Sequence, residues 1–331
     1  FGSIGIQPSE FGKLGIAIVT AASLSSMTGK AQDLKYVLRA NALLLIPMIL
    51  VLLQPDAGTF LVYTSILLVF YREGMAYDIL VRFIINKFIP GVTIRRPLHF
   101  INNFIPILLY VVIISISTLL LMSSTVGIPF TDFELPGYFG VIFSLLFIVL
   151  IFYLAIRRMV AKRARKSIVT VLLVSFLFST LLIVGVQFGF NKLASHQKVR
   201  IELFLGLTED QDGEDYNRNR AMSAVGSGKF SGKGYREATI ASPKHKHVPM
   251  QSTDFIFSTW AEEWGFVGSS IVVILFTTLI IRLVFVAERQ RAQFSRVFIY
   301  CVACIFFYHL LIHVGMVIGL APVIGIPLPF F

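Results

Sequence analysis

Long apolar blocks alternate with short polar connections along the whole chain. A helix that crosses a hydrocarbon core of about 30 Å needs roughly 18 or more apolar residues, and most of these blocks reach that length. The pattern therefore predicts an all-α polytopic membrane protein with eight spans in this sequence. The predicted spans cover residues 11–28, 36–53, 57–71, 104–122, 137–156, 168–190, 265–287 and 297–319.

The composition agrees with lipid as the solvent. Hydrophobic residues make up 56% of the chain and charged residues 14%, against about 25% charged residues in an average soluble domain. The formal net charge is +11, but the cations lie in short runs beside apolar blocks, where membrane orientation explains them. We therefore expect membrane lipids and no nucleic acid as partners, and a single membrane domain over residues 1–331.

The basic residues assign the two sides of the membrane, because cytoplasmic connections carry an excess of Lys and Arg. With alternating spans, the segment 191–253 becomes a long extracytoplasmic loop. The stretch 72–103 mixes apolar and basic residues, which is typical of an amphipathic cytoplasmic insertion lying on the headgroups. The four basic connections, which hold 18 of the 29 Lys and Arg residues, are 29–39, 72–103, 157–167 and 282–296.

The cysteines and two of the histidines lie in the last apolar block. Cys301 and Cys304 have CxxC spacing, but inside a membrane helix small packing residues explain them better than redox chemistry does. His309 and His313 have the i, i+4 spacing that lets two imidazoles meet one ion. Because no third ligand is evident nearby, we favour hydrogen bonds across helices for this pair.

Ionisable residues gather at the outer ends of the predicted spans, where they are costly unless they pair or serve a function. Glu10 and Lys13 lie three residues apart on one helical face, so they can form an ordinary structural ion pair. Asp56 stands in a segment of a kind that also occurs in ordinary tight turns. Thr253 and Asp254 precede an apolar run, so either can cap the following helix, and a cap does not require an aspartate.

Two adjacent carboxylates follow along the same run. Glu262 and Glu263 stand directly before Trp264, about two helical turns after Asp254. One of the two is expected to face protein, because an unpaired carboxylate among acyl chains is costly.

Five segments are similar, in order and spacing, to signature segments of the SEDS (shape, elongation, division and sporulation) family. Within that family the chain resembles the elongation-type, RodA-like members more than the division-type, FtsW-like ones. The resemblance implies a SEDS-type helical bundle of roughly ten spans, of which this sequence would hold about eight. Met250 and Ser252 depart from the family pattern, which has an acidic residue and a histidine there. The matching segments are QPSEFGKL (7–14), QPDAGT (54–59), VGSGKFSGKGY (225–235), STDFIFSTWAEEWGFVGS (252–269) and GMVIGLAPVIGIPLPF (315–330).

The resemblance implies a peptidoglycan glycosyltransferase in the bacterial cytoplasmic membrane. Its substrate would be lipid II, a disaccharide-peptide on a polyprenyl pyrophosphate, polymerised into glycan strands at the outer face. The expected reaction is an inverting displacement with Asp254 as the general base, because a neutral hydroxyl is a poor nucleophile. The expected partner is a class B penicillin-binding protein, the transpeptidase that cross-links the strands.

The remaining site residues also come from the resemblance. Glu10 and Lys13 match polar positions of the family's central cavity, with Glu10 holding a divalent cation such as Mg²⁺ and Lys13 meeting phosphate oxygens. Arg200 is a second phosphate candidate, for which an interfacial anchor is an equal alternative. Substrate contacts are further expected from Gln54, Asp56 and Thr253.

Two other functions fit the same sequence. A flippase or transporter of lipid-linked cell-wall precursors would also need a polar cavity near the headgroups. A non-catalytic membrane scaffold for a cell-wall complex would tolerate substitution of Asp254, Glu10 and Lys13. Movement of a labelled precursor without polymer supports the flippase, whereas polymer supports the enzyme.

Overall fold

The structure of the protein is a computed structural model, and its contacts divide the chain into two compact units. The first unit comprises Phe1–Ala76 and Glu209–Phe331, and the second comprises Tyr77–Thr208. The single membrane domain over 1–331 stays a prediction. The residues that the structure describes are 8–26, 33–54, 56–75, 77–88, 113–120, 125–127, 134–159, 162–193, 195–205, 207, 214–241 and 253–331.

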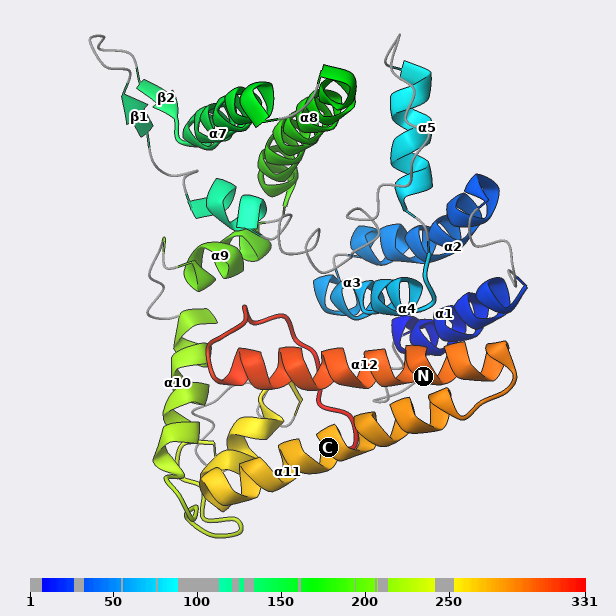
Figure 1. The fold of residues 1–331 in the computed structure, drawn as a ribbon. Coiled ribbons are helices and arrows are strands. Elements are labelled where there is room, and N and C mark those ends of the chain that lie inside the picture. Colours follow the sequence, from blue (N-terminus) through cyan, green and yellow to red (C-terminus); the bar gives the residue numbers. More distant parts are fainter. Residues whose placement is uncertain are drawn as a thin grey trace. The chain divides into compact units, whose positions relative to one another are not determined.

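The first unit is built around two long neighbouring helices, α11 and α12, which run antiparallel (Figure 1). Helix α1 packs along α12, α2 and α3 pack on α1, and α10 packs against α11. Figure 1 shows the last residues of the chain turning back along α12. The helices of this unit are α1 (Pro8–Ser25), α2 (Leu34–Leu53), α3 (Ala57–Thr64), α4 (Ile66–Arg72), α10 (Glu214–Ser227), α11 (Ile256–Glu288) and α12 (Gln293–Val317).

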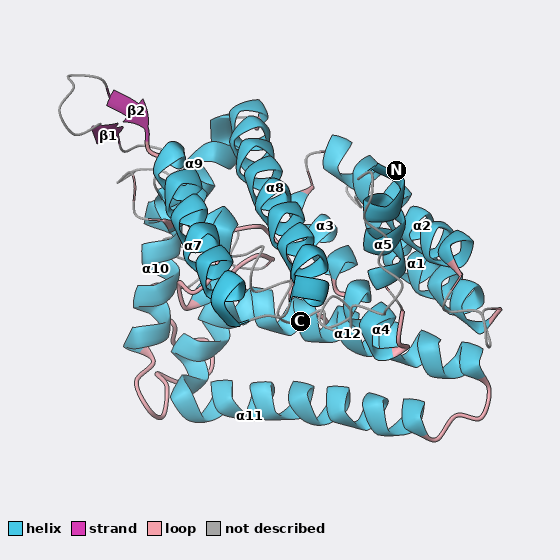
Figure 2. Ribbon diagram, turned by 45° about the horizontal axis from the view of Figure 1, so that its top comes forward, coloured by secondary structure: helices cyan, strands magenta, loops and turns pink. Residues whose placement is uncertain are grey.

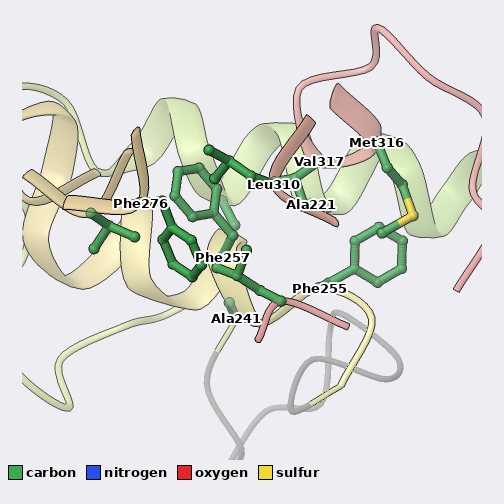
Figure 3. Packing of buried hydrophobic residues seen from close by; sticks show 11 residues of the cluster. Ala221, Ala241, Phe255, Phe257, Phe276, Leu310, Met316 and Val317 are labelled. Carbon is green, nitrogen blue, oxygen red and sulfur yellow. The ribbon is translucent and has the colours of Figure 1, made fainter. Parts of the chain in front are cut away.

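A buried hydrophobic cluster joins α10, α11 and α12 (Figure 3). Phe255 and Phe257 come from the start of α11, and Met316 and Val317 from the end of α12. In Figure 3 the ring of Phe255 lies beside the thioether of Met316. Full burial of one such side chain contributes about 1.5–3 kcal/mol, so the cluster fixes the start of α11 against the end of α12.

The predicted span 57–71 is two short helices, α3 and α4, that meet at Ser65. The Thr64 hydroxyl donates to the Leu61 carbonyl at 2.6 Å, and the Ser65 N–H bonds to the Val62 carbonyl. A hydroxyl that takes a carbonyl of the preceding turn competes with the regular i→i−4 ladder, so the turn tightens there. Ser65 itself has helical φ and ψ of −57° and −29°, so the predicted block 57–71 is helical on both sides of a tightened turn.

Helix α11 bends at Gly265, whose φ of 64° and ψ of −162° are not helical. A Cβ at this glycine would lie 2.3 Å from the backbone nitrogen of Gly232, so a loop approaches the bend too closely for any other residue. The N–H groups that the bend frees are used by that loop: Phe266 donates to the Lys229 carbonyl and Val267 to the Phe230 carbonyl. The predicted span 265–287 is the arm of α11 after this bend.

Within the described residues, four helices are long and apolar enough to cross a membrane: Leu34–Leu53, Leu172–Lys192, Ile256–Glu288 and Gln293–Val317. Gly58–Arg72 and Tyr138–Leu154 are shorter apolar helices. The predicted block 11–28 is helix α1, but it is not among the four. Of the predicted block 104–122, the structure describes residues 113–120, which are helical.

The second unit holds two long helices packed on each other and a small hairpin (Figure 2). Ile114, Val141 and Ile183 form its buried cluster. Among the residues that the structure describes, the insertion predicted over 72–103 contains one helix, and the loop predicted over 191–253 contains two, one of them in the first unit, but their positions at the membrane stay predictions. The elements of this unit are α5 (Asp78–Phe88), β1 (Thr125–Gly127), antiparallel β2 (Glu134–Pro136), α7 (Tyr138–Met159), α8 (Lys162–Lys192) and α9 (Ser195–Phe204).

Candidate functional site

Residues Ile324–Leu328, here called the strap, follow α12 and link several parts of the candidate site. The side chain of Ile326 is buried against Val62 of α3 and Ile312 of α12. A Cβ at Gly58, in the first turn of α3, would lie 2.9 Å from Cγ1 of Ile326 and 3.2 Å from the Ile324 carbonyl. The strap therefore lies in close contact with both α3 and α12.

The strap is held on α12 by two histidines one turn apart. Nδ1 of His309 lies 3.0 Å from the Pro327 carbonyl, and Nδ1 of His313 lies 2.7 Å from the Ile326 carbonyl. Both imidazoles are buried. Since a carbonyl only accepts, each Nδ1 carries the proton and donates it. The prediction that this pair makes hydrogen bonds is confirmed.

Lys13 joins α1 to this pair. Its ammonium lies 2.6 Å from Oε1 of Glu10 and 3.0 Å from Nε2 of His309. An ammonium has three donors and no acceptor, so Nε2 must accept, which agrees with the proton on Nδ1. The predicted Glu10–Lys13 ion pair is present, with the Lys13 side chain 8% exposed and that of Glu10 45% exposed. Glu10 thus keeps contact with the surroundings while Lys13 lies inside.

Asp56 has a structural role at the start of α3. One carboxylate oxygen accepts from the Thr59 N–H at 2.9 Å and caps α3, and the other accepts from the Ser9 hydroxyl at 3.2 Å. Tyr63 donates to the Ser9 carbonyl at 3.2 Å. Asp56 and Tyr63 therefore fasten the start of α1 to α3. Gln54 ends α2 as its C-cap, with an exposed side chain.

Asp254 does not cap α11. The N-cap is Phe255, which makes no side-chain cap hydrogen bond, so the capping alternative for Asp254 is wrong. The half-buried carboxylate instead lies against the strap, because a Cβ at Gly325 would be 3.2 Å from its Oδ2. Gly325 has a φ of 68°, a region in which glycine is strongly favoured. Thr253, next to it, is exposed.

Lys13 and Asp254 are linked to the same short segment. Lys13 is linked to it through His309, which bonds to Pro327, and Asp254 lies against Gly325. The two links meet the strap two residues apart, so one short stretch of backbone relates the position of the carboxylate to that of the ammonium.

Glu262 is a buried residue whose importance the sequence indicated only weakly. Its carboxylate is fully buried and accepts from Lys233 Nζ at 2.5 Å and from the N–H groups of Thr239, Ile240 and Ala241 at 2.7–2.9 Å. Because it ties the loop 233–241 to the arm of α11 that follows Asp254, we assign it a structural role. The expectation that one of Glu262 and Glu263 faces protein is confirmed.

Two predicted features remain outside this cluster. Arg200 lies in α9 of the second unit, and its role as a phosphate contact stays a prediction. In the part of the chain that the structure describes, no group of three or more His, Cys, Asp or Glu residues has a metal-binding arrangement. Both cysteines are free thiols, Cys301 buried and Cys304 partly buried, as expected for packing residues.

Comparison with models of known protein families identifies the family of this chain. The model of the family FTSW_RODA_SPOVE, described as cell cycle protein, matches residues 1–104 and 140–331. The chain belongs to this family. Its members are the SEDS proteins, so the predicted family and the all-α polytopic membrane fold are confirmed.

Relatives of this SEDS chain carry glycosyltransferase names. It is 29% identical over 330 residues to peptidoglycan glycosyltransferase RodA of Treponema pallidum, which covers 99% of this chain and 70% of the relative. It is 35% identical over 140 residues to peptidoglycan glycosyltransferase MrdB of Escherichia coli K12, which covers 42% of this chain and 37% of the relative. A probable peptidoglycan glycosyltransferase FtsW of Thiomicrospira cyclica is 31% identical, over 50% of this chain and 40% of the relative. The match to RodA along almost the whole chain confirms the RodA-like assignment.

The matched lengths limit what these relatives establish. The chain spans well under half the length of the MrdB and FtsW relatives. Among solved structures, a chain described under structural coordination of polymerization and crosslinking by a peptidoglycan synthase complex is similar at 19% identity. The similarity covers 82% of this chain and 89% of that chain, with a TM-score of 0.32, which is too low to establish a shared fold or a partner.

Proposed function

We propose that this SEDS chain carries the glycosyltransferase site of a peptidoglycan polymerase, which joins lipid II into glycan strands. The observation that carries the proposal is that Asp254 lies against the strap and that Lys13 is linked to the same strap through His309. Relatives that match the chain are named peptidoglycan glycosyltransferases, which supports the reaction class. The chain has helices long and apolar enough to cross a membrane, so a polyprenyl-linked substrate would reach the site from the surrounding lipid.

Asp254 acts as the general base in this proposal. A hydroxyl oxygen of the acceptor lipid II attacks the anomeric carbon of the donor, and the bond from that carbon to the pyrophosphate oxygen breaks. The hydroxyl proton moves to Asp254, and the pyrophosphate leaves with the bonding electron pair. Attack from the face opposite the leaving group inverts the anomeric centre. A positioned base contributes about 10²- to 10⁴-fold to such a step.

Lys13 stabilises the charge that develops on the leaving pyrophosphate. Two of its three N–H donors meet Glu10 and His309, which leaves one donor for a phosphate oxygen. A cation in a partly water-excluded site acts more strongly than one in bulk water. Glu10 holds Lys13 in place from its more exposed side.

A divalent cation at Glu10 is a further part of the proposal. Mg²⁺ in phosphate-transfer sites takes one or two carboxylates together with substrate phosphates and water. Since no cluster of three protein ligands is found in the described residues, Glu10 would hold the ion jointly with the pyrophosphate. The ion would supply additional charge neutralisation at that group.

The remaining predicted substrate contacts differ in how well the structure supports them. Gln54 and Thr253 have exposed side chains, so they are accessible for contact. Asp56 is already engaged on both oxygens, which favours a structural role over direct contact. Arg200 is proposed as a second phosphate contact from the extracytoplasmic segment.

The proposed location is the bacterial cytoplasmic membrane, with the site on its outer face. The basic connections support this orientation, because they lie between the spans on the side opposite to the matched segments. A class B penicillin-binding protein is the proposed partner, since strands that this chain makes need a transpeptidase to cross-link them.

The test measures glycan strands formed from purified lipid II by the protein in vesicles. We expect Asp254→Asn to lower the rate by about 10²- to 10⁴-fold while the protein stays folded, with Cys304→Ala as a control on α12. Polymer formation by Asp254→Asn at the control rate would remove Asp254 from the mechanism. Transfer of a labelled precursor across the vesicle membrane without any polymer would favour the flippase instead.

A further inference from the structure

The α12 histidines hold the segment that the Asp254 carboxylate lies against, and one of them, His309, also bonds to Lys13. His313 is fully buried and bonds to the Ile326 carbonyl at 2.7 Å, and His309 bonds to the Pro327 carbonyl at 3.0 Å. These carbonyls follow Gly325 directly in the chain. The two bonds therefore fix the backbone that lies against the carboxylate of Asp254.

The strap itself has little other anchoring of a directional kind among the described residues. The Ile324 N–H meets the Met316 sulfur at 3.4 Å, which is a weak acceptor, and Ile326 contributes apolar packing. Apolar packing fixes how deeply the strap is buried but not its rotation about its own axis. A hydrogen bond also fixes the direction of the peptide group that takes part in it. The hydrogen bonds from His309 and His313 therefore fix the orientation of the peptide units around Gly325.

The geometry excludes the alternative that the pair is a metal site. Both Nδ1 atoms donate to carbonyls, and Nε2 of His309 accepts from Lys13, so three of the four ring nitrogens are engaged. Nε2 of His313 is buried and makes no hydrogen bond to the described residues. A single remaining nitrogen cannot form a joint ligand set with its neighbour.

We propose that His309 and His313 are positioning residues for the proposed glycosyl transfer. They hold Lys13 and the Gly325 backbone in one rigid arrangement and thereby set the place of the Asp254 carboxylate relative to the Lys13 ammonium. This inference rests on the proposed function, because it gives the histidines a role in that reaction. Neither histidine touches the reacting atoms in this account.

The His313 imidazole bonds through Nδ1 to the carbonyl of Ile326, the residue after Gly325, and a Cβ at Gly325 would be 3.2 Å from Oδ2 of Asp254. Misplacement by about 1 Å of a catalytic group can lower a rate by about 10²-fold. A small rotation of the strap is therefore sufficient to be seen in kcat.

A matched pair of amides at position 313 tests the proposal. An asparagine amide has its nitrogen at the δ position, like Nδ1, so His313→Asn can still donate to the Ile326 carbonyl. A glutamine amide lies one bond further out, so His313→Gln loses that bond with a side chain of the same chemical kind. We expect kcat for polymerisation to stay within about threefold of the parent in His313→Asn and to fall about 10- to 100-fold in His313→Gln, with KM nearly unchanged.

The outcomes separate this inference from the proposed function. Equal rates in the Asn and Gln variants, or a loss confined to KM, overturn the positioning role while an inactive Asp254→Asn leaves the glycosyltransferase proposal standing. Full activity of Asp254→Asn removes both. If His313→Gln does not purify as folded protein, Gly325→Ala tests the same strap without touching a histidine. Its Cβ would press on Oδ2 of Asp254, so an unchanged kcat in that variant also overturns the inference.

Discussion

The ammonium of Lys13 donates to Nε2 of His309 across two helices, with 3.0 Å between the two nitrogens. The partners are 296 residues apart in the chain, and this one bond joins the start of α1 to the strap-bearing end of α12. The same ammonium pairs with Glu10, which is half exposed. A buried cation held from both sides is suited to meet an anionic group that arrives from outside, such as a pyrophosphate.

Replacing Lys13 by Met should separate catalysis from folding. The variant removes the charge that stabilises the leaving group, so we expect kcat to fall about 10²- to 10³-fold. The fold should persist, because Glu10 is exposed enough to be hydrated and His309 keeps its bond to Pro327. The measurement is lipid II polymerisation in vesicles beside thermal unfolding in detergent, with Cys304→Ala as the control. A fall in unfolding temperature that accounts for the whole loss of activity would contradict the catalytic role.

The sequence predicted the helices better than the contacts between them. Apolar runs gave α2, α11 and α12 because burial in lipid depends on local composition, and the Glu10–Lys13 pair followed from helical spacing alone. The tightened turn at Ser65 was not predicted, because it depends on a hydroxyl that competes for one carbonyl.

The site was predicted as a set of residues, but not as an arrangement. Nothing local in the sequence links His313 to Ile326 or Asp254 to Gly325, because these contacts form only when α12, the strap and the start of α11 pack together. The histidine spacing suggested partners across helices without naming them. Their partners turned out to be backbone carbonyls, which a sequence pattern does not distinguish from one another.

Glu262 should govern stability rather than chemistry. Glu262→Gln replaces one acceptor oxygen by a donor that faces backbone N–H groups, and it leaves Lys233 without its anionic partner. Loss of one side of a buried ion pair costs about 3–5 kcal/mol, so we expect a clearly lower unfolding temperature. Glu263→Gln is the matched control, because Glu263 holds the loop through its backbone carbonyl, and it should change stability by no more than about 0.5 kcal/mol.

Limited proteolysis of the Glu262 and Glu263 variants tests whether the loop 233–241 is loosened. The loop 233–241 should be cleaved faster in Glu262→Gln than in the parent, since five of its groups lose or weaken their acceptor. Equal cleavage in the Glu262 and Glu263 variants would show that the loop is held by its backbone contacts to α11 instead.

Two glycines on α1 offer a test of the contact between α1 and α3. A Cβ at Gly12 would lie 2.3 Å from the hydroxyl oxygen of Tyr63, which is buried and bonded to the Ser9 carbonyl, so the ring cannot move away freely. A Cβ at Gly15 meets nothing within 4 Å. We expect Gly12→Ala to destabilise the protein by about 1–3 kcal/mol, and Gly15→Ala to stabilise it by about 0.5–1 kcal/mol, because alanine favours a helix interior.

The double variant Gly12→Ala/Tyr63→Phe distinguishes a steric clash from a general intolerance of change at position 12. Without the hydroxyl, the nearest ring atom is the Tyr63 Cζ position at 3.6 Å, an ordinary van der Waals distance. The double variant should therefore unfold at a higher temperature than Gly12→Ala, although Tyr63→Phe alone loses the bond to Ser9. Since Ser9 also donates to Asp56, its position bears on the Glu10 and Lys13 end of α1. Additive losses in the double variant would mean that α1 and α3 do not approach each other at Gly12.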